Sequence, residues 1–220
     1  MSVVIGYVTE TVSLIVTDTR ITFGREPDRY FEDGHKKLIN LDQFGFAAGA
    51  GASDFLTDLN ELLDDPNLNS IDSIETVFNN CYEEHLHKKI YTSSELNSSA
   101  LLMSWISIID ELPKCRVGIL NKEMGDLKFI NDNHFFVLYP KEFQDNKDLV
   151  KKFEKTFEKE YVFNNDVNEI LIRMLKRFDY IQSLSEMTSN IAEYGLFGFN
   201  RNGLIKQTDK VVLSASKNDV

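Results

Sequence analysis

Hydrophobic and polar residues alternate along the first part of the chain, and this period of two predicts β-strands. Apolar side chains occupy every second position from Val12 to Val16, while Glu10 and Thr11 leave room only for a hairpin turn before them. Residues 24–34 are rich in polar residues, Gly and Pro, which predicts a loop. The predicted strands here cover residues 2–9, 12–23, 36–42 and 44–50.

After these strands the hydrophobic period changes to that of a helix. Ser53 is placed to cap the first helix and Pro66 to end it, and a second helix is expected over about residues 70–91. Strand patterns separated by turn residues return between residues 98 and 140.

Two more helices and a group of strands are expected in the remainder of the chain. The first helix carries apolar residues at a spacing of four, namely Leu149, Phe153, Phe157 and Tyr161. Asp166 and Glu169 match a capping box at the start of the second. The closing strands are expected around residues 191–199, 203–207 and 210–215.

The order is therefore strands, two helices, strands, two helices, strands. Two stacked sheets with helix pairs outside would bury every apolar face, so we expect an α/β fold, a four-layer αββα sandwich. Nothing in the sequence marks a seam, and residues 1–220 are expected to form a single domain.

Composition excludes several functional classes. The formal net charge of -11 disfavours nucleic-acid binding, because an acidic surface repels phosphates. Cys81 and Cys115 are the only cysteines, which favours a reducing compartment over a disulfide scaffold. Without a signal peptide or a long apolar span, we expect a cytoplasmic protein that does not cross a membrane. The two helical histidines, His85 and His87, point to different faces, so a metal site is disfavoured.

Candidate chemistry begins at Ser2, which follows Met1. Removal of Met1 is expected before so small a residue, and it would leave a serine with a free α-amino group beside its hydroxyl. Such an amine can act as the general base for its own hydroxyl. A nearby lysine ammonium would lower the pKa of that amine, and a carboxylate would hold the lysine in place. On their own, a serine after Met1 and an Asp-x-Arg pair on a strand are common features.

Three segments carry a family resemblance: VVIGYVTETVSLIVTDTRITFG, DGHKKLINLD and FGFAAGAGASD, at residues 3–24, 33–42 and 44–54. They resemble the opening of proteasome β-type subunits and of the peptidase subunit of the bacterial two-component ATP-dependent protease. These are N-terminal-nucleophile (Ntn) hydrolases, which begin at a threonine or serine nucleophile. Because no helical extension precedes the first predicted strand, the resemblance implies a β-type subunit rather than the non-catalytic gating type.

The resemblance implies a site. Ser2 would be the nucleophile, Asp18 would orient Lys37, and Arg20 would support the aspartate. A backbone N–H at Gly49 would serve the oxyanion hole, and Gly51 is a close rival because the turn is one residue longer than usual. The distal acidic residue and serine of the family correspond to Glu186 and Ser189.

The family also implies partners: a peptide or protein substrate, a homo-oligomeric ring, an ATPase unfoldase in some members, and no cofactor. Two alternatives stay open. One is a non-catalytic module on the same fold, favoured by HFFVLYP at residues 134–140, where the family has a Gly/Ser-rich segment. The other is a small-molecule amidase.

Overall fold

A computed structural model describes residues 2–23, 28–42, 44–158 and 166–213. Within these residues the chain is a mixed α/β structure with antiparallel sheets. The first five-stranded sheet has the order β10-β1-β2-β11-β12. Its strands are β1 (Val4–Val8), β2 (Val12–Asp18), β10 (Phe135–Leu138), β11 (Ile191–Asn200) and β12 (Gly203–Val212).

The second five-stranded sheet has the order β5-β6-β7-β8-β9. Its strands are β5 (Ile39–Asn40), β6 (Phe46–Ala50), β7 (Ala100–Ile109), β8 (Leu112–Asn121) and β9 (Gly125–Phe129). A separate two-stranded ribbon pairs β3 (Ile21–Phe23) with β4 (Tyr30–Glu32).

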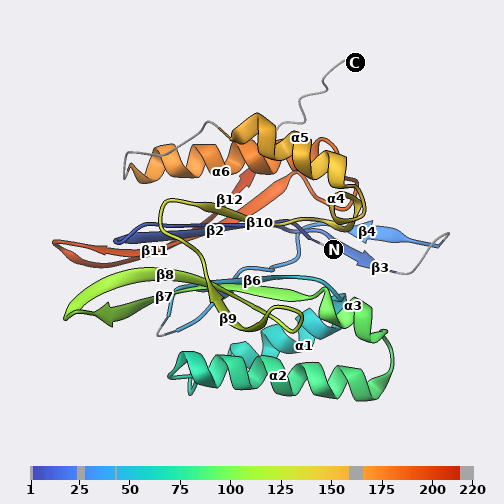
Figure 1. Ribbon diagram of the computed structural model, residues 1–220, viewed down its shortest axis with the longest axis horizontal. Helices are drawn as coiled ribbons and strands as arrows, with labels where there is room; N and C mark the ends of the chain where they lie inside the picture. The colour runs from blue at the N-terminus through green and yellow to red at the C-terminus, as the bar shows by residue number, and fades with distance from the viewer. Residues whose placement is uncertain (1, 24–27, 43, 159–165, 214–220) are drawn as a thin grey trace.

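Helices cover the outer side of each five-stranded sheet (Figure 1). One group is α1 (Ser53–Leu63), α2 (Ile71–Lys88) and α3 (Ser93–Asn97), beside the second sheet. The other is α4 (Lys141–Gln144), α5 (Lys147–Phe157) and α6 (Val167–Gln182), beside the first sheet.

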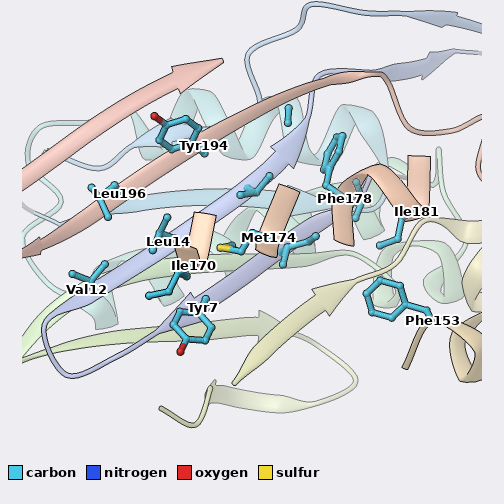
Figure 2. Close-up of a cluster of buried hydrophobic side chains, with 14 of the residues drawn as sticks. Tyr7, Val12, Leu14, Phe153, Ile170, Met174, Phe178, Ile181, Tyr194 and Leu196 are labelled. Carbon is cyan, nitrogen blue, oxygen red and sulfur yellow. The ribbon is translucent and has the colours of Figure 1, made fainter. Parts of the chain in front are cut away.

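Three hydrophobic clusters hold this arrangement together. Successive side chains of a strand point to opposite faces of its sheet, so each sheet packs against helices on one face and against the other sheet on the other. The first joins β1, β2 and β11 to α5 and α6 and includes Met174 and Phe178 (Figure 2). A second joins α1 and α2 to the sheet that contains β7. The third lies between the two sheets, where Val4 and Ile15 meet Phe46 and Leu102. The two sheets therefore share a core.

Lys206 on β12 links the first sheet to the turn between β5 and β6. Its ammonium donates to the carbonyl oxygens of Leu41 at 2.6 Å, Asp42 at 3.2 Å and Phe44 at 2.7 Å. Burial lowers the pKa of Lys206.

Several sequence expectations need correction. The predicted strand over residues 12–23 is divided, since β2 ends at Asp18 and β3 belongs to the separate ribbon. The predicted loop over residues 24–34 contains β4 in its described part. Ser53 is the first residue of α1 rather than its cap, because Ala52 occupies that position and makes no side-chain hydrogen bond.

Other expectations missed short elements or merged strands. The short helices α3 and α4 were not expected. One strand, β12, covers the described part of the two strands predicted at 203–207 and 210–215, and residues 214 and 215 lie outside the described residues. Asp166 caps α6 by accepting from the backbone N–H of Asn168. Tyr161 lies outside the described residues.

Both cysteines are free and buried, on α2 and β8. Burial raises the pKa of Cys81 to about 11 and that of Cys115 to about 12. In the part of the chain that is described, no helix combines the length and apolar character needed to cross a membrane.

Candidate active site

Ser2 lies at the entrance to β1, next to the end of β2. Antiparallel pairing sets Val4 opposite Thr17, so the residues that precede β1 meet those that end β2. The carbonyl oxygen of Val3 accepts hydrogen bonds from the Thr17 hydroxyl at 3.2 Å and from the Asp18 N–H at 3.4 Å. These contacts fix Ser2, which is 7% exposed, close to Asp18, which is fully buried.

Lys37 connects these two residues. Its ammonium nitrogen is 2.5 Å from Ser2 Oγ and 3.1 Å from each carboxylate oxygen of Asp18. It also donates to the backbone carbonyl of Arg20. The ammonium is therefore held by a charge, a hydroxyl and a carbonyl, which uses all three of its protons.

The electrostatics of this group have two opposing causes. Burial lowers the pKa of Lys37, since it disfavours the charged form, while the Asp18 carboxylate acts in the opposite direction. Burial is the larger effect, so the pKa of Lys37 lies below its ordinary value. A buried lysine with a lowered pKa beside a serine hydroxyl is typical of sites that move protons.

The segment that carries Lys37 is attached to the turn after β2 and to β11. The N–H of His35 donates to the Thr19 carbonyl at 3.0 Å, and the N–H of Leu38 donates to the Glu193 carboxylate at 3.4 Å. Glu193 is buried on β11 and was not singled out from the sequence. An isolated Glu within a strand pattern gives no signal of such a role.

The Arg20 side chain points to other partners than Lys37, and it links its own segment to those of Asp33 and Glu186. Its guanidinium binds Asp33 with two hydrogen bonds, of 2.7 and 2.8 Å, and donates to the Glu186 carbonyl oxygen at 2.5 Å. The hydrogen bond to Asp33 raises the pKa of Arg20, and the same bond holds the pKa of Asp33 below its ordinary value. Asp33 lies in the predicted loop and was missed, although an arginine beside a candidate site needs a counterion.

Ser189 contacts the turn that follows Asp18. Its hydroxyl accepts from the Thr19 N–H at 3.1 Å, lies 3.1 Å from the Thr19 hydroxyl and donates to the Ile191 carbonyl at 3.0 Å. Ser189 is fully buried. The two distal residues from the sequence therefore reach the site in different ways, Ser189 through its side chain and Glu186 through its backbone.

A cleft of about 1090 Å³ opens over Ser2 and Lys37. Gly49 at the end of β6 and Gly51 after it both line this cleft. Gly51 has φ +148°, and an added Cβ would lie 2.5 Å from the Ser99 Cα, so only glycine fits there. Gly49 is closely covered by Leu56, whose Cδ2 would be 2.4 Å from an added Cβ.

The segment HFFVLYP forms β10 and the turn after it. β10 pairs with β1, and Pro140 is the N-cap of α4, which brings Lys141 to the cleft. Among the described residues, no group of three or more His, Cys, Asp or Glu side chains is arranged to hold a metal ion.

The sheet order and the helix placement are consistent with a proteasome-like fold. The structure is similar to Anbu from Hyphomicrobium sp. strain MC1, with a TM-score of 0.65 and 13% sequence identity, over 96% of this chain and 87% of that chain. No family model and no curated protein matches the sequence. At this identity the likeness shows the fold alone, and the resemblance read from the three motifs is confirmed at that level.

Proposed function

We propose that the chain is an N-terminal serine hydrolase that cleaves peptide or other amide bonds, with Ser2 exposed by removal of Met1. The observation that carries this proposal is the contact between Ser2 Oγ and the Lys37 ammonium, which Asp18 holds from the other side. In a serine with a free α-amine, that ammonium would lower the pKa of the amine and keep it unprotonated near neutral pH.

Acylation follows from this arrangement. The Ser2 amine takes the hydroxyl proton while Oγ bonds to the substrate carbonyl carbon, and the carbonyl π electrons move to its oxygen. A backbone N–H at Gly49 or Gly51 would stabilise the oxyanion. When the oxyanion collapses, the C–N bond breaks, and the leaving nitrogen takes the proton from the Ser2 ammonium. An ester on Ser2 remains.

Deacylation uses the same base. The amine takes a proton from water, the resulting hydroxide bonds to the ester carbon, and the C–Oγ bond then breaks. Oγ recovers its proton from the ammonium, and the carboxylic acid product leaves. Asp18 and Lys37 hold their charges throughout, and no cofactor takes part in these steps.

The remaining features of the proposal concern architecture and partners. We interpret residues 1–220 as one four-layer αββα domain, supported by the shared core between the sheets and by the helices on both outer sides. We further propose a homo-oligomeric ring of at least six subunits, cytoplasmic, with Ser2 facing its interior and an ATPase unfoldase as a candidate partner. Sedimentation at micromolar concentration tests the ring, and a monomer of about 25 kDa would overturn it.

The test of the hydrolase combines intact mass with turnover. The native protein should have lost Met1 and should release product from a mixed library of fluorogenic peptides and small amides. Ser2→Ala should abolish release and Ser2→Thr should keep part of it, because threonine offers the same amine and hydroxyl. Ser183→Ala, a change at the exposed end of α6, is the matched control.

A non-catalytic module is the second candidate. It is favoured by the bulky β10 segment and by Pro140, where the resembled family has a Gly/Ser-rich segment. Retention of Met1 would support it, because the proposed base would then be part of a peptide bond. Turnover of small amides without peptides would instead identify an amidase.

A further inference from the structure

One wall of the cleft over Ser2 is formed by a single face of α1. Asp54, Thr57, Asn60 and Glu61 all line the cleft, and their spacing of three and four residues sets them on the same side of the helix. The face therefore presents two carboxylates, a hydroxyl and an amide to whatever occupies the cleft. α1 carries no Lys, Arg or His.

The polar groups on this face have no partners within the described residues. The Asp54 and Glu61 side chains are exposed and form neither an ion pair nor a hydrogen bond there. Asn60 Oδ1 is buried and accepts no hydrogen bond. A buried acceptor without a donor is unfavourable, because it has lost its water. A ligand that brings positive charge into the cleft would give the Asp54 and Glu61 carboxylates a partner.

Helix stability explains only one of these carboxylates. Asp54 lies in the first turn of α1, where a negative charge is favourable. Glu61 lies in the last turn, where the helix dipole favours a positive charge, and no basic residue is present in that turn. Glu61 therefore lowers the stability of α1, and its place in the cleft lining indicates a role in binding.

Basic residues line parts of the cleft outside α1, together with the carboxylate of Asp145 at the C-cap of α4. Lys36 precedes the candidate catalytic Lys37, and Lys141 begins α4; both line the cleft. The charge of the cleft lining is therefore uneven, with an acidic face at α1 and basic residues at Lys36 and Lys141. A substrate charge would be favoured on one side and disfavoured on the other.

We propose, resting on the hydrolase function above, that the cleft selects peptides with a cationic side chain, lysine or arginine, on the α1 side of the bond that is cleaved. Asp54 and Glu61 attract the charge, and Thr57 and Asn60 line the cleft between them. These residues determine specificity, while bond cleavage stays with Ser2.

The experiment uses quenched fluorescent heptapeptides of Ala and Gly that contain one Lys, one norleucine or one Glu. The single residue is moved along the peptide, and mass spectrometry identifies the bond that is cleaved. Norleucine has the four side-chain carbons of lysine and lacks only its ammonium group. At one position on the α1 side of the cleaved bond, kcat/KM for the Lys peptide should exceed that for the norleucine peptide about three- to tenfold. On the other side of the bond, the norleucine peptide should be cleaved faster than the Lys peptide.

Variants assign the effect to α1. Glu61→Gln should remove most of the preference for Lys at the favoured position, and Glu61→Lys should replace it with a preference for Glu. Glu84→Gln makes the same charge change on an exposed site of α2 outside the cleft and should leave the preference unchanged. Equal rates for Lys, norleucine and Glu at every position, or a preference that survives Glu61→Lys, would overturn the proposal.

A binding measurement separates this proposal from the hydrolase proposal. Ser2→Ala protein is titrated with dye-labelled versions of the same peptides, and binding is followed by fluorescence anisotropy. The Lys peptide should bind more tightly than the norleucine peptide, and the difference should shrink between about 0.01 M and 1 M salt. If no peptide is hydrolysed, the hydrolase proposal fails, while equal binding of the two peptides refutes the charge selection.

Discussion

The ion pair between Asp18 and Lys37 can be broken with one change, Asp18→Asn. Asparagine keeps the shape of the side chain and an oxygen that can accept from the Arg20 N–H, now 3.0 Å from Asp18 Oδ2. It removes the charge that faces Lys37 at 3.1 Å. Asp18 is fully buried, so water cannot replace the missing charge.

The size of the effect depends on pH. Removing one partner of a buried ion pair costs about 3–5 kcal/mol of the free energy of unfolding. Lys37 can limit this loss by releasing its proton. From an ordinary lysine pKa of about 10.5 and about 1.36 kcal/mol per unit, this sets a ceiling of about 5 kcal/mol at pH 7 and about 2 kcal/mol at pH 9.

The sign of the pH dependence follows from proton binding. In the variant, loss of the Asp18 charge lowers the pKa of folded Lys37 further, so between that pKa and the ordinary lysine pKa the unfolded state binds more protons. Stability then rises with pH in that range. The native protein shares this sign, because burial lowers the pKa of Lys37, but its slope is smaller because Asp18 opposes the shift.

Urea unfolding at pH 7 and pH 9 measures this difference. The destabilisation by Asp18→Asn should be about 3 kcal/mol or more at pH 7 and should be clearly smaller at pH 9. Adding Lys37→Met should recover part of the loss, since the unpaired ammonium is gone. Asp110→Asn, in the exposed turn between β7 and β8, is the control and should stay within about 0.5 kcal/mol of the native protein. An equal destabilisation at both pH values would refute the reasoning.

Three further predictions concern other parts of the structure. Lys37→Ala should lower kcat/KM and move the acid limb of the pH–rate profile to higher pH, because no ammonium lowers the pKa of the Ser2 amine; Lys128→Ala, on exposed β9, should change neither. In thermal unfolding, Gly51→Ala should lower the free energy of unfolding by about 3 kcal/mol. Gly203→Ala, at φ +121° with open space around it, should lower it by only about 1 kcal/mol. Lys206→Met should cost about 1–3 kcal/mol in urea unfolding, and no loss would show that its three carbonyl contacts are dispensable.

The long elements could be predicted from the sequence because their hydrophobic period is uninterrupted. α6 shows this well, since Ile170, Met174 and Phe178 recur at helical spacing and are all fully buried. The grouping of Ser2, Asp18 and Lys37 was also expected, from a family resemblance rather than from any periodicity. The structure brings the three together by pairing β1 with β2.

The division between β2 and β3 could not be predicted from alternation. Asp18 and Arg20 continue the pattern of β2, and no Gly or Pro marks the point where the chain leaves the sheet. Ser189, 170 positions further on, accepts the Thr19 N–H at that point. A local pattern cannot contain such a contact, and the same holds for the pairing of Arg20 with Asp33, which depends on how the loop folds back.

The burial of Cys81 and Cys115 has a practical consequence for labelling. A thiol whose pKa is raised to about 11 or about 12 is almost entirely protonated at neutral pH and reacts slowly with alkylating reagents. Neither native cysteine is therefore expected to react appreciably with maleimide dyes, and neither needs to be replaced before labelling. A single cysteine introduced at Thr57, on the rim of the cleft, would carry one fluorophore and report occupancy of the site directly.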